Sequence, residues 1–457
     1  PCLLNNSCPC HCRTTCCKKG LPMKLCLKNC ASVLTNSDDG PEFLHGQDII
    51  MENDRIHAIA DTGKVPYEGP IVDCSGLTAI PGLVQTHIHL CQTPFRNTAD
   101  DVELLDWLSG YIWPGESRLS FTELKLGARI GIAELLRGGT TTILDMATIR
   151  HTDAVFQALE EAGIRAISGK CLMDDTSICP PELVEDTASA LAETEKLIEN
   201  WHGKNGLLDV AITPRFAVSC TTDLMRECAR LSEKYSLLIH THASENKKEI
   251  ELVRNKTGYG NLEYLEKIGF LGPRTCIAHC VHMEDDDWKR IKASGSHVLH
   301  CPSSNLKLAS GIAPVPRMLD EGISVSLGAD GPPCNNLLDG FMEMRLAALI
   351  QKPFHGPTAM DARTVFRMAT LHGARALGKD AGRLESGRLA DIALLDLGQF
   401  HHVPATHLYS TLVYATRASD VRHVVVGGSL RVQDGRLTYG DSQRWLKDFR
   451  EQFEASS

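Results

Sequence analysis

The sequence predicts an α/β fold, a (β/α)8 TIM-type barrel flanked by a small β domain that is built from both chain ends. Between Gly82 and about Gly378, short apolar β-rich runs alternate with amphipathic stretches such as 119–139. Alternation of this kind is typical of βα units around a parallel sheet, and eight such units are enough to close a barrel. Strand-like runs separated by turns lie on both sides of this region.

The N-terminal part is expected to form short strands. The runs 25–35, 47–60 (with an Asn-Asp turn) and 70–82 predict a small β module. Residues 1–22 hold the motifs CPCHC and TTCC, whose irregular cysteine spacing does not match a regular zinc knuckle. We expect 1–22 to be a disordered extension that is foreign to the fold.

Eight predicted strands follow, at 82–89, 140–147, 165–174, 208–216, 237–244, 275–282, 296–304 and 324–330. After Leu384 the strand pattern returns in two runs, the second with an Asp-Gly hairpin signal at 434–435. The predicted organisation is therefore an extension (1–22), the N-terminal part of the β domain (23–80), the barrel (81–380), the C-terminal part of the β domain (381–440) and a C-terminal helix or tail (441–457).

Composition excludes several classes of protein. The 47 Lys and Arg against 57 Asp and Glu give a formal charge of -10, so no net positive field attracts nucleic acid. No run approaches the ~18 to 20 apolar residues of a membrane span. The ten cysteines beyond residue 30 are scattered, which suggests free thiols in a reducing cytoplasm. A small-molecule partner is expected.

Five titratable side chains stand where predicted strands end. They are His87, His89, His242, His279 and Asp330, in the motifs THIH, HTHASE, AHC and GAD. Because the carboxyl ends of barrel strands converge on one face, we expect these side chains to meet, although they are far apart in the sequence. Imidazoles gathered around a carboxylate are what a metal site needs.

These residue types favour zinc. Strand alternation sends His87 and His89 to the same side, where they can share one cation. With His242 and Asp330 they supply imidazole and carboxylate ligands, and a catalytic zinc keeps one position open for water. We expect one Zn²⁺ per chain, although such ligands also accept Fe²⁺ or other divalent ions. The fourth predicted strand ends in AITPRF, without a lysine to bridge a second metal.

Glu245 is the candidate proton shuttle. Zinc lowers the pKa of bound water from 15.7 to about 7, which provides a nucleophile at neutral pH. Glu245 follows His242 closely enough to take a proton from water and pass it to the substrate. Asp330 can also accept that proton, and His279 can stabilise developing charge. The remaining histidines on predicted strands are expected to be mostly hydrogen-bonded core residues: His240, His282, His297 and His300.

The motifs PGLVQTHIH, HTHASE, AHCVH, HCPSSNLKLASGIAP, LGADG and SGRLADIALLD resemble the amidohydrolase superfamily, specifically its cytosolic aminohydrolases and chlorohydrolases of purines and s-triazines. The resemblance implies a barrel with a flanking β-sandwich, one divalent metal and hydrolytic loss of amine or chloride from an aromatic heterocycle. It places the acid/base glutamate on Glu245 and a further site histidine on His279. It places the metal ligands on His87, His89, His242 and Asp330. It also implies a homo-oligomer.

Two parts of the chain resemble different deaminases. GTTTILDMATIRHTD, AITPRFAVSC and AHCVHMEDDDW are similar to guanine deaminases, whose guanine-binding positions fall on Gln92 and Arg215. SNLKLASGIAPVPRML, GADGPPCNN and EMRLAALIQK are similar to methylthioadenosine, S-adenosylhomocysteine and 5'-deoxyadenosine deaminases, whose ribose-binding glutamate falls on Glu116. The alternative for these three residues is a salt bridge or loop-fixing hydrogen bond. Trp107 and Trp113 either stack on a flat substrate ring or belong to a helix core.

The sequence thus predicts a zinc-dependent deaminase of an aminopurine, with an adenosine-type nucleoside favoured: 5'-deoxyadenosine, methylthioadenosine or S-adenosylhomocysteine. Guanine deamination is the second hypothesis and hydrolysis of a chloro- or amino-triazine the third. An inactive amidohydrolase-like scaffold is the alternative of another class. The intact set of metal and proton-transfer residues argues against that scaffold.

Overall fold

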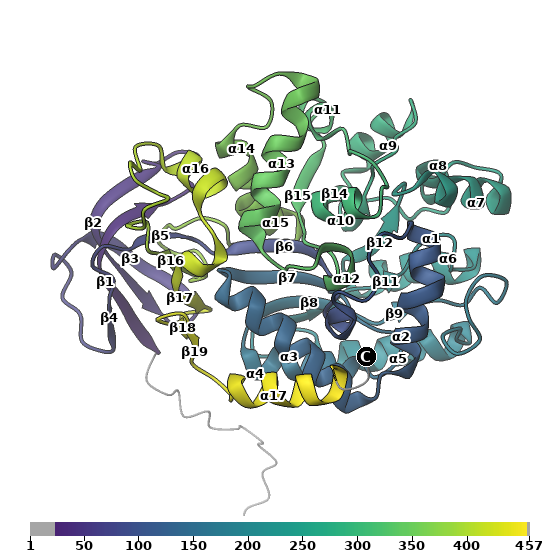
Figure 1. The fold of residues 1–457 in the computed structure, drawn as a ribbon, viewed down its shortest axis with the longest axis horizontal. Helices are drawn as coiled ribbons and strands as arrows, with labels where there is room; N and C mark the ends of the chain where they lie inside the picture. Colours follow the sequence, from purple (N-terminus) through teal and green to yellow (C-terminus); the bar gives the residue numbers. More distant parts are fainter. Residues whose placement is uncertain (1–22, 455–457) are drawn as a thin grey trace, which may run out of the picture.

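The computed structural model describes residues 23–454 and has an α/β architecture (Figure 1). The predicted extension 1–22, with its cysteine motifs, lies outside the described residues, as does the last part of the predicted tail, 455–457. Two groups of strands are present: parallel strands in the centre of the molecule and a mostly antiparallel sheet at one side.

The parallel strands form two four-stranded sheets, in the orders β6-β7-β8-β10 and β12-β13-β14-β15. Parallel bridges join the two sheets, between Ile212 and Ile239 and between Ile88 and Asp330. Each of the eight predicted strand segments contains one of these strands: β6 (Leu83–Ile88), β7 (Thr140–Met146), β8 (Arg165–Gly169), β10 (Leu208–Val210), β12 (Ile239–Ala243), β13 (Thr275–His279), β14 (His297–His300) and β15 (Ser324–Leu327).

Two predicted strands are interrupted. The segment 165–174 divides into β8 and β9 (Cys171–Leu172), and 208–216 into β10 and β11 (Thr213–Pro214). The two short strands pair with each other in a separate parallel sheet. A Cβ on Gly169 would lie 2.4 Å from the Ala211 carbonyl oxygen, so this close approach of two chains requires glycine. The interruption of the two predicted strands follows from this close approach of Gly169 to Ala211.

Helices follow most of the parallel strands, and the Ser120 capping box begins the longest of them, α3. The helices of eight or more residues are α3 (Phe121–Arg137), α4 (Thr152–Ala162), α5 (Thr187–Trp201), α6 (Thr222–Tyr235), α7 (Lys247–Thr257), α9 (Asp287–Ser294), α13 (Gly340–His355) and α17 (Ser442–Phe453). The shorter ones are α1 (Leu104–Trp107), α2 (Trp113–Arg118), α8 (Asn261–Lys267), α10 (Pro302–Lys307), α11 (Val315–Asp320), α12 (Pro332–Asn335), α14 (Ala362–Arg367), α15 (Gly373–Ala376) and α16 (Leu408–Ser410).

Strands from both chain ends share the second sheet, as the sequence predicted. Its order is β19-β18-β17-β16-β5-β1-β2-β3, with β4 paired to β1. Antiparallel pairing of β5 with β16 joins the two ends. The strands are β1 (Lys24–Leu34), β2 (Phe43–Glu52), β3 (Arg55–Asp61), β4 (Ile71–Asp73), β5 (Thr78–Pro81), β16 (Ile392–Leu395), β17 (Val421–Val426), β18 (Ser429–Gln433) and β19 (Arg436–Leu437).

The predicted turns have the expected backbone. Asn53 has φ +54° between β2 and β3, and Asp434 and Gly435 have φ +50° and +73° between β18 and β19. Left-handed backbone at both central residues, as at Asp434 and Gly435, is what a type I′ hairpin turn needs, and Asn53 supplies it at the first of the two residues between β2 and β3. Sequence therefore specifies these two hairpins locally.

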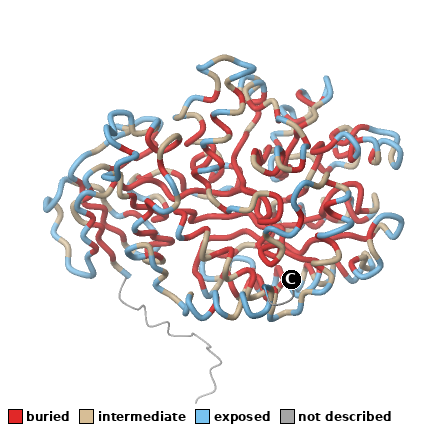
Figure 2. Tube along the Cα trace, viewed as in Figure 1, coloured by how far each residue is buried: buried red, intermediate tan, exposed pale blue. Residues whose placement is uncertain are grey.

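Buried residues concentrate along the central strands (Figure 2). The nine-stranded sheet has an apolar cluster of its own, in which Leu27 and Ile49 from the N-terminal part meet Leu394 and Val425 from the C-terminal part. The buried pair Arg165–Asp391, with Nε and Oδ2 2.7 Å apart, connects β8 to the chain just before β16. Among the described residues, no helix is long and apolar enough to cross a membrane, and the cysteines are free thiols.

Candidate active site

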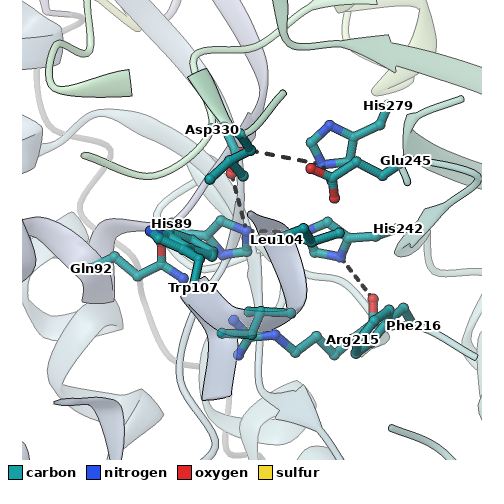
Figure 3. Close-up of a pocket in the computed structure, with 12 residues that line it drawn as sticks. His89, Gln92, Leu104, Trp107, Arg215, Phe216, His242, Glu245, His279 and Asp330 are labelled. Atoms are coloured by element: carbon teal, nitrogen blue, oxygen red, sulfur yellow. Dashed lines mark hydrogen bonds and ion pairs between the residues drawn. The ribbon is translucent and has the colours of Figure 1, made fainter. Parts of the chain in front are cut away.

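Three imidazoles and one carboxylate meet at the carboxyl ends of β6, β12 and β15. Figure 3 shows three of these four side chains, those of His89, His242 and Asp330. The Nε2 atoms of His87 and His89 lie 3.2 and 3.4 Å from Oδ1 of Asp330. The Nε2 atoms of His89 and His242 are 3.2 Å apart. The structure thus brings together the four residues that the sequence analysis singled out as metal ligands.

Backbone carbonyls orient two of the rings. Nδ1 of His89 lies 2.9 Å from the Met146 carbonyl oxygen, and Nδ1 of His242 lies 2.7 Å from that of Arg215. A carbonyl only accepts, so each Nδ1 carries the hydrogen and each Nε2 keeps its lone pair. Burial, followed by the charge of His87, lowers the pKa of His89 to about 3. Both rings are therefore neutral ligands aimed at one point.

His87 is held by a histidine that was expected to be a core residue. Its Nδ1 lies 2.7 Å from Nε2 of His240, which is fully buried beneath the cluster. The Nε2 atom of His87 is buried and has no hydrogen-bond partner among the described residues. An orphaned nitrogen at this place is the feature that a bound cation explains.

The residues fit a divalent metal. Two ligands at about 2.0 to 2.1 Å from one tetrahedral zinc ion are separated by about 3.3 Å, close to the spacings above. Burial by itself would raise the pKa of Asp330, but His87 and His279 hold it well below its usual range, so the carboxylate is charged. Three imidazoles and one carboxylate form a donor set that suits zinc and its neighbours.

Glu245 and His279 stand beside this cluster. Nε2 of His279 is 3.4 Å from Oε2 of Glu245 and 3.8 Å from Oδ2 of Asp330. Burial raises the pKa of Glu245 to about 7, which suits a group that takes and returns a proton near neutral pH. Burial lowers the pKa of His279, but the carboxylates of Glu245 and Asp330 outweigh it and raise the value.

Neighbouring side chains hold these two groups in place. Nδ1 of His279 lies 2.8 Å from Oδ1 of Asn305, and the Ser310 hydroxyl donates to Oε1 of Glu245 at 3.3 Å. The Glu245 backbone N–H donates to Glu249 at 2.8 Å within the cap of α7. The sequence analysis missed Asn305, Ser310 and Glu249. A capping pattern at Asn246 could have pointed to Glu249, but no local signal marks the other two.

The backbone is strained at three residues in or next to the site. Ser244, His279 and Asp330 have φ of +56°, +75° and +63°, the left-handed region that side chains other than glycine rarely adopt. Such conformations cost of order 1–3 kcal/mol each and gather at functional sites. The surrounding packing therefore holds the backbone in these conformations next to the cluster.

A pocket with an empty volume of about 370 Å³ opens onto the cluster. Its lining contains most of the predicted site residues and a set of apolar side chains that the sequence analysis did not identify, apart from Trp107. The lining residues are His89, Gln92, Leu104, Trp107, Leu108, Arg215, Phe216, His242, Glu245, His279, Leu308 and Asp330. Figure 3 shows the cation of Arg215 on the side of the pocket opposite Asp330.

Glu116 does not line the pocket; it lies behind Gln92 and Arg215. Its carboxylate accepts from Nε2 of Gln92 at 3.0 Å and from Nη1 of Arg215 at 2.8 Å, and all three side chains are buried. Trp113 also lies outside the lining, in the apolar core, whereas Trp107 faces the pocket. Glu116 thus orients the two polar pocket residues.

The chain is similar to known deaminases over most of its length. The chain is 40% identical over 407 residues to a 5'-deoxyadenosine deaminase of Methanothermobacter thermautotrophicus, covering 87% of this chain and 93% of the relative. It is 39% identical over 411 residues to a 5-methylthioadenosine/S-adenosylhomocysteine deaminase of Syntrophobacter fumaroxidans, covering 89% and 92%.

Solved structures with the same fold include an adenosine deaminase from Xanthomonas campestris with bound zinc, with TM-score 0.88, 27% identity and coverage of 94% of this chain and 98% of that one. E. coli guanine deaminase has TM-score 0.81, 29% identity and coverage of 90% and 99%. The sequence profile of the Amidohydrolase family matches residues 78–431. Since this match spans most of the chain and the curated relatives align over nearly their full length, the chain belongs to the amidohydrolase family.

Proposed function

We propose that the chain is a metal-dependent hydrolytic deaminase that releases ammonia from an adenosine-type nucleoside: 5'-deoxyadenosine, methylthioadenosine or S-adenosylhomocysteine. One observation carries the proposal: the carboxyl of Glu245 lines the same pocket as His89, His242 and Asp330 and lies 3.4 Å from Nε2 of His279. The names of the two curated relatives support the substrate class.

We further propose that His87, His89, His242 and Asp330 hold one zinc ion per chain. When bound, a divalent ion of this kind acts as a Lewis acid that makes water a stronger nucleophile. The zinc in the Xanthomonas campestris structure supports this choice of metal.

Glu245 moves the proton. Addition of water to the ring carbon that bears the amine requires a proton at the neighbouring ring nitrogen, and departure of ammonia requires one at the amine. The Glu245 carboxyl oxygens can take both protons in turn from the attacking water and deliver them, because the raised pKa leaves the group able to gain and lose a proton near pH 7. His279 and Asp330 face the same space and orient the water, while Trp107 and Phe216 exclude bulk solvent.

Guanine is the second candidate, and the pocket gives a specific reason for it. Arg215 lines the pocket and can donate to a ring carbonyl. The amide N–H of Gln92 is bound to Glu116, which leaves its buried Oε1 without a partner and able to accept from an amino group. A carbonyl edge beside an amino edge is the pattern of guanine. Triazine hydrolysis and the inactive scaffold are the remaining alternatives.

We also infer that the parallel strands close into a (β/α)8 barrel at about 81–380, flanked by a small β-sandwich from 23–80 and 381–440. The bridges between the two parallel sheets support closure. Inward side chains from neighbouring strands support it too, since they share one apolar cluster: Val84, Leu144, Ile167, Cys276 and Leu299. The separate cluster in the nine-stranded sheet supports the second unit.

We expect a homo-oligomer. Met342 and Leu349, two turns apart on α13, are 44% and 41% exposed, and exposed apolar side chains on one helix face favour association. Light scattering after size-exclusion chromatography measures the mass: a multiple of the chain mass agrees with this proposal, and the mass of one chain contradicts it.

The test of function is a substrate panel. Metal-replete protein is given 5'-deoxyadenosine, methylthioadenosine, S-adenosylhomocysteine, guanine and a chlorotriazine separately, and ammonia and chloride are measured. We expect a 5'-modified adenosine to react fastest and Glu245→Gln to be about 100-fold slower or more. Preference for guanine would move the proposal to the second candidate. No turnover of any compound by protein that holds its metal would overturn the deaminase assignment.

A further inference from the structure

A second group of potential metal ligands lies outside the pocket. His401 and His402 belong to the loop between β16 and α16, and Asp420 ends the short turn Ala418–Asp420 that precedes β17. These elements belong to the nine-stranded sheet and its connections, on the side of the molecule away from α1 and α7 (Figure 1). None of the three residues lines the active-site pocket.

The three ligand atoms are spaced as in the catalytic cluster. Nε2 of His401 and Nε2 of His402 lie 3.1 and 3.3 Å from Oδ2 of Asp420. The two ring centroids are 4.1 Å apart. Ligands that share one ion at about 2.0 to 2.2 Å are separated by such distances. Both histidines therefore present a nitrogen to the same point near one carboxylate oxygen.

The Asp420 carboxylate oxygen is approached by more nitrogens than it can accept from. Its Oδ2 already accepts from the Arg417 backbone N–H at 2.8 Å, so three nitrogens crowd an oxygen with about two lone-pair directions. His402 is fully buried, and its Nε2 also lies 3.4 Å from the Thr416 hydroxyl. One imidazole nitrogen can therefore keep its lone pair and present it to an ion.

The site is also preorganised and accessible. The turn backbone fixes Asp420 through Arg417, and burial fixes His402, so little side-chain entropy is lost on binding. The side chain of His401 is 30% exposed, which gives an ion a path from solvent. Two imidazoles and a carboxylate suit zinc, nickel or copper rather than magnesium or calcium.

We propose that His401, His402 and Asp420 bind a second divalent transition-metal ion, with water in the remaining coordination positions. The ion connects the loop after β16 to the turn before β17, and so fixes the connection between two neighbouring strands of the nine-stranded sheet. This role is structural, and it is independent of the reaction in the pocket.

The experiment counts metal ions. Wild-type protein, His401→Gln and the control His407→Ala are dialysed against buffer with micromolar free zinc, and zinc per chain is measured by mass spectrometry of the elements. His407 is an exposed histidine of the same loop that is not part of the cluster. We expect His401→Gln to hold one ion fewer than wild type and His407→Ala to hold the same number. Equal counts in all three proteins would overturn the proposal.

A stability measurement accompanies the count, because His401→Gln could lower metal content by unfolding the chain. Each metal-free protein is titrated with zinc and its Tm is recorded together with its circular dichroism. Wild type and His407→Ala should show two saturable increases in Tm, and His401→Gln only one, with an unchanged spectrum before zinc is added. Two increases in His401→Gln would contradict the site, since the second ion would then bind elsewhere.

Discussion

The carbonyl oxygen of Arg215 lies 2.7 Å from Nδ1 of His242, while the guanidinium of the same residue lines the pocket. One residue thus connects the candidate metal cluster to the candidate substrate site. The bond to His242 comes from the backbone, so a substitution at position 215 keeps it. The side chain can be changed without releasing the metal.

Arg215→Met tests this separation. The variant should retain its metal and raise KM for guanine about 10-fold or more, because a donor to the ring carbonyl is lost. It should also lose about 3 to 5 kcal/mol of stability, since Glu116 is left as a buried, unpaired carboxylate. Urea unfolding and metal analysis measure the two effects. The double variant Arg215→Met/Glu116→Gln should recover much of the stability; failure to recover would mean that the pair is not the cause.

His87→Ala removes a ligand from the cluster. We expect metal binding at this site to be lost and kcat/KM to fall by about 1000-fold or more, equivalent to about 4 kcal/mol of barrier. His297→Ala is the matched control, because His297 begins the parallel strand β14 at the end away from the cluster, where it contacts Ser324. Equal metal content in both variants would show that His87 is not a ligand.

The raised pKa of Glu245 predicts how kcat/KM depends on pH. Its pKa of about 7 means that the carboxylate able to take a proton is present above that pH and is lost as pH falls through it. The value of kcat/KM should therefore rise with pH to a plateau above about 7. Glu245→Gln should lower kcat about 10² to 10⁴-fold, keep its metal and lose this limb. An unchanged limb in the variant would assign the titration to another group.

The buried pair Arg165–Asp391 joins the parallel strands to the nine-stranded sheet, and it should contribute more to the free energy of unfolding than an exposed ion pair does. Both side chains are 2% exposed, and Asp391→Ala leaves the guanidinium unpaired, which should cost about 3 to 5 kcal/mol. The exposed pair Lys289–Asp286, at 82% and 64%, is the control, and Asp286→Ala should cost less than about 1 kcal/mol. Similar losses of unfolding free energy in Asp391→Ala and Asp286→Ala, measured by denaturant unfolding, would contradict this expectation.

Strand ends are the part of the site that the sequence specifies. His87, His89, His242 and Asp330 were predicted to meet because parallel strands place their carboxyl ends on one edge, and the pairing of β6 with the residues after β15 brings them there. The hairpin turns at Asn53 and Asp434 were predictable for a different, local reason: Asn, Asp and Gly tolerate positive φ.

Contacts between distant segments were not predictable. A salt bridge or hydrogen bond was the alternative predicted for Gln92, Glu116 and Arg215, and the structure shows both. Nothing in the sequence shows that these three residues pair with one another, because long-range ion pairs leave no periodic pattern. The break between β8 and β9 depends on the crossing of Gly169 with the Ala211 carbonyl, which also lies far away in the chain. Tertiary packing decides both features.

Product analysis in heavy-oxygen water tests the central claim most directly. Metal-replete protein and Glu245→Gln are incubated with 5'-deoxyadenosine in this water, and ammonia and product mass are measured together. Hydrolytic deamination predicts one ammonia for each oxo-purine formed, one solvent oxygen in that product, and almost none of either with the variant. An unchanged substrate in the presence of bound metal, or a product without solvent oxygen, would contradict the account.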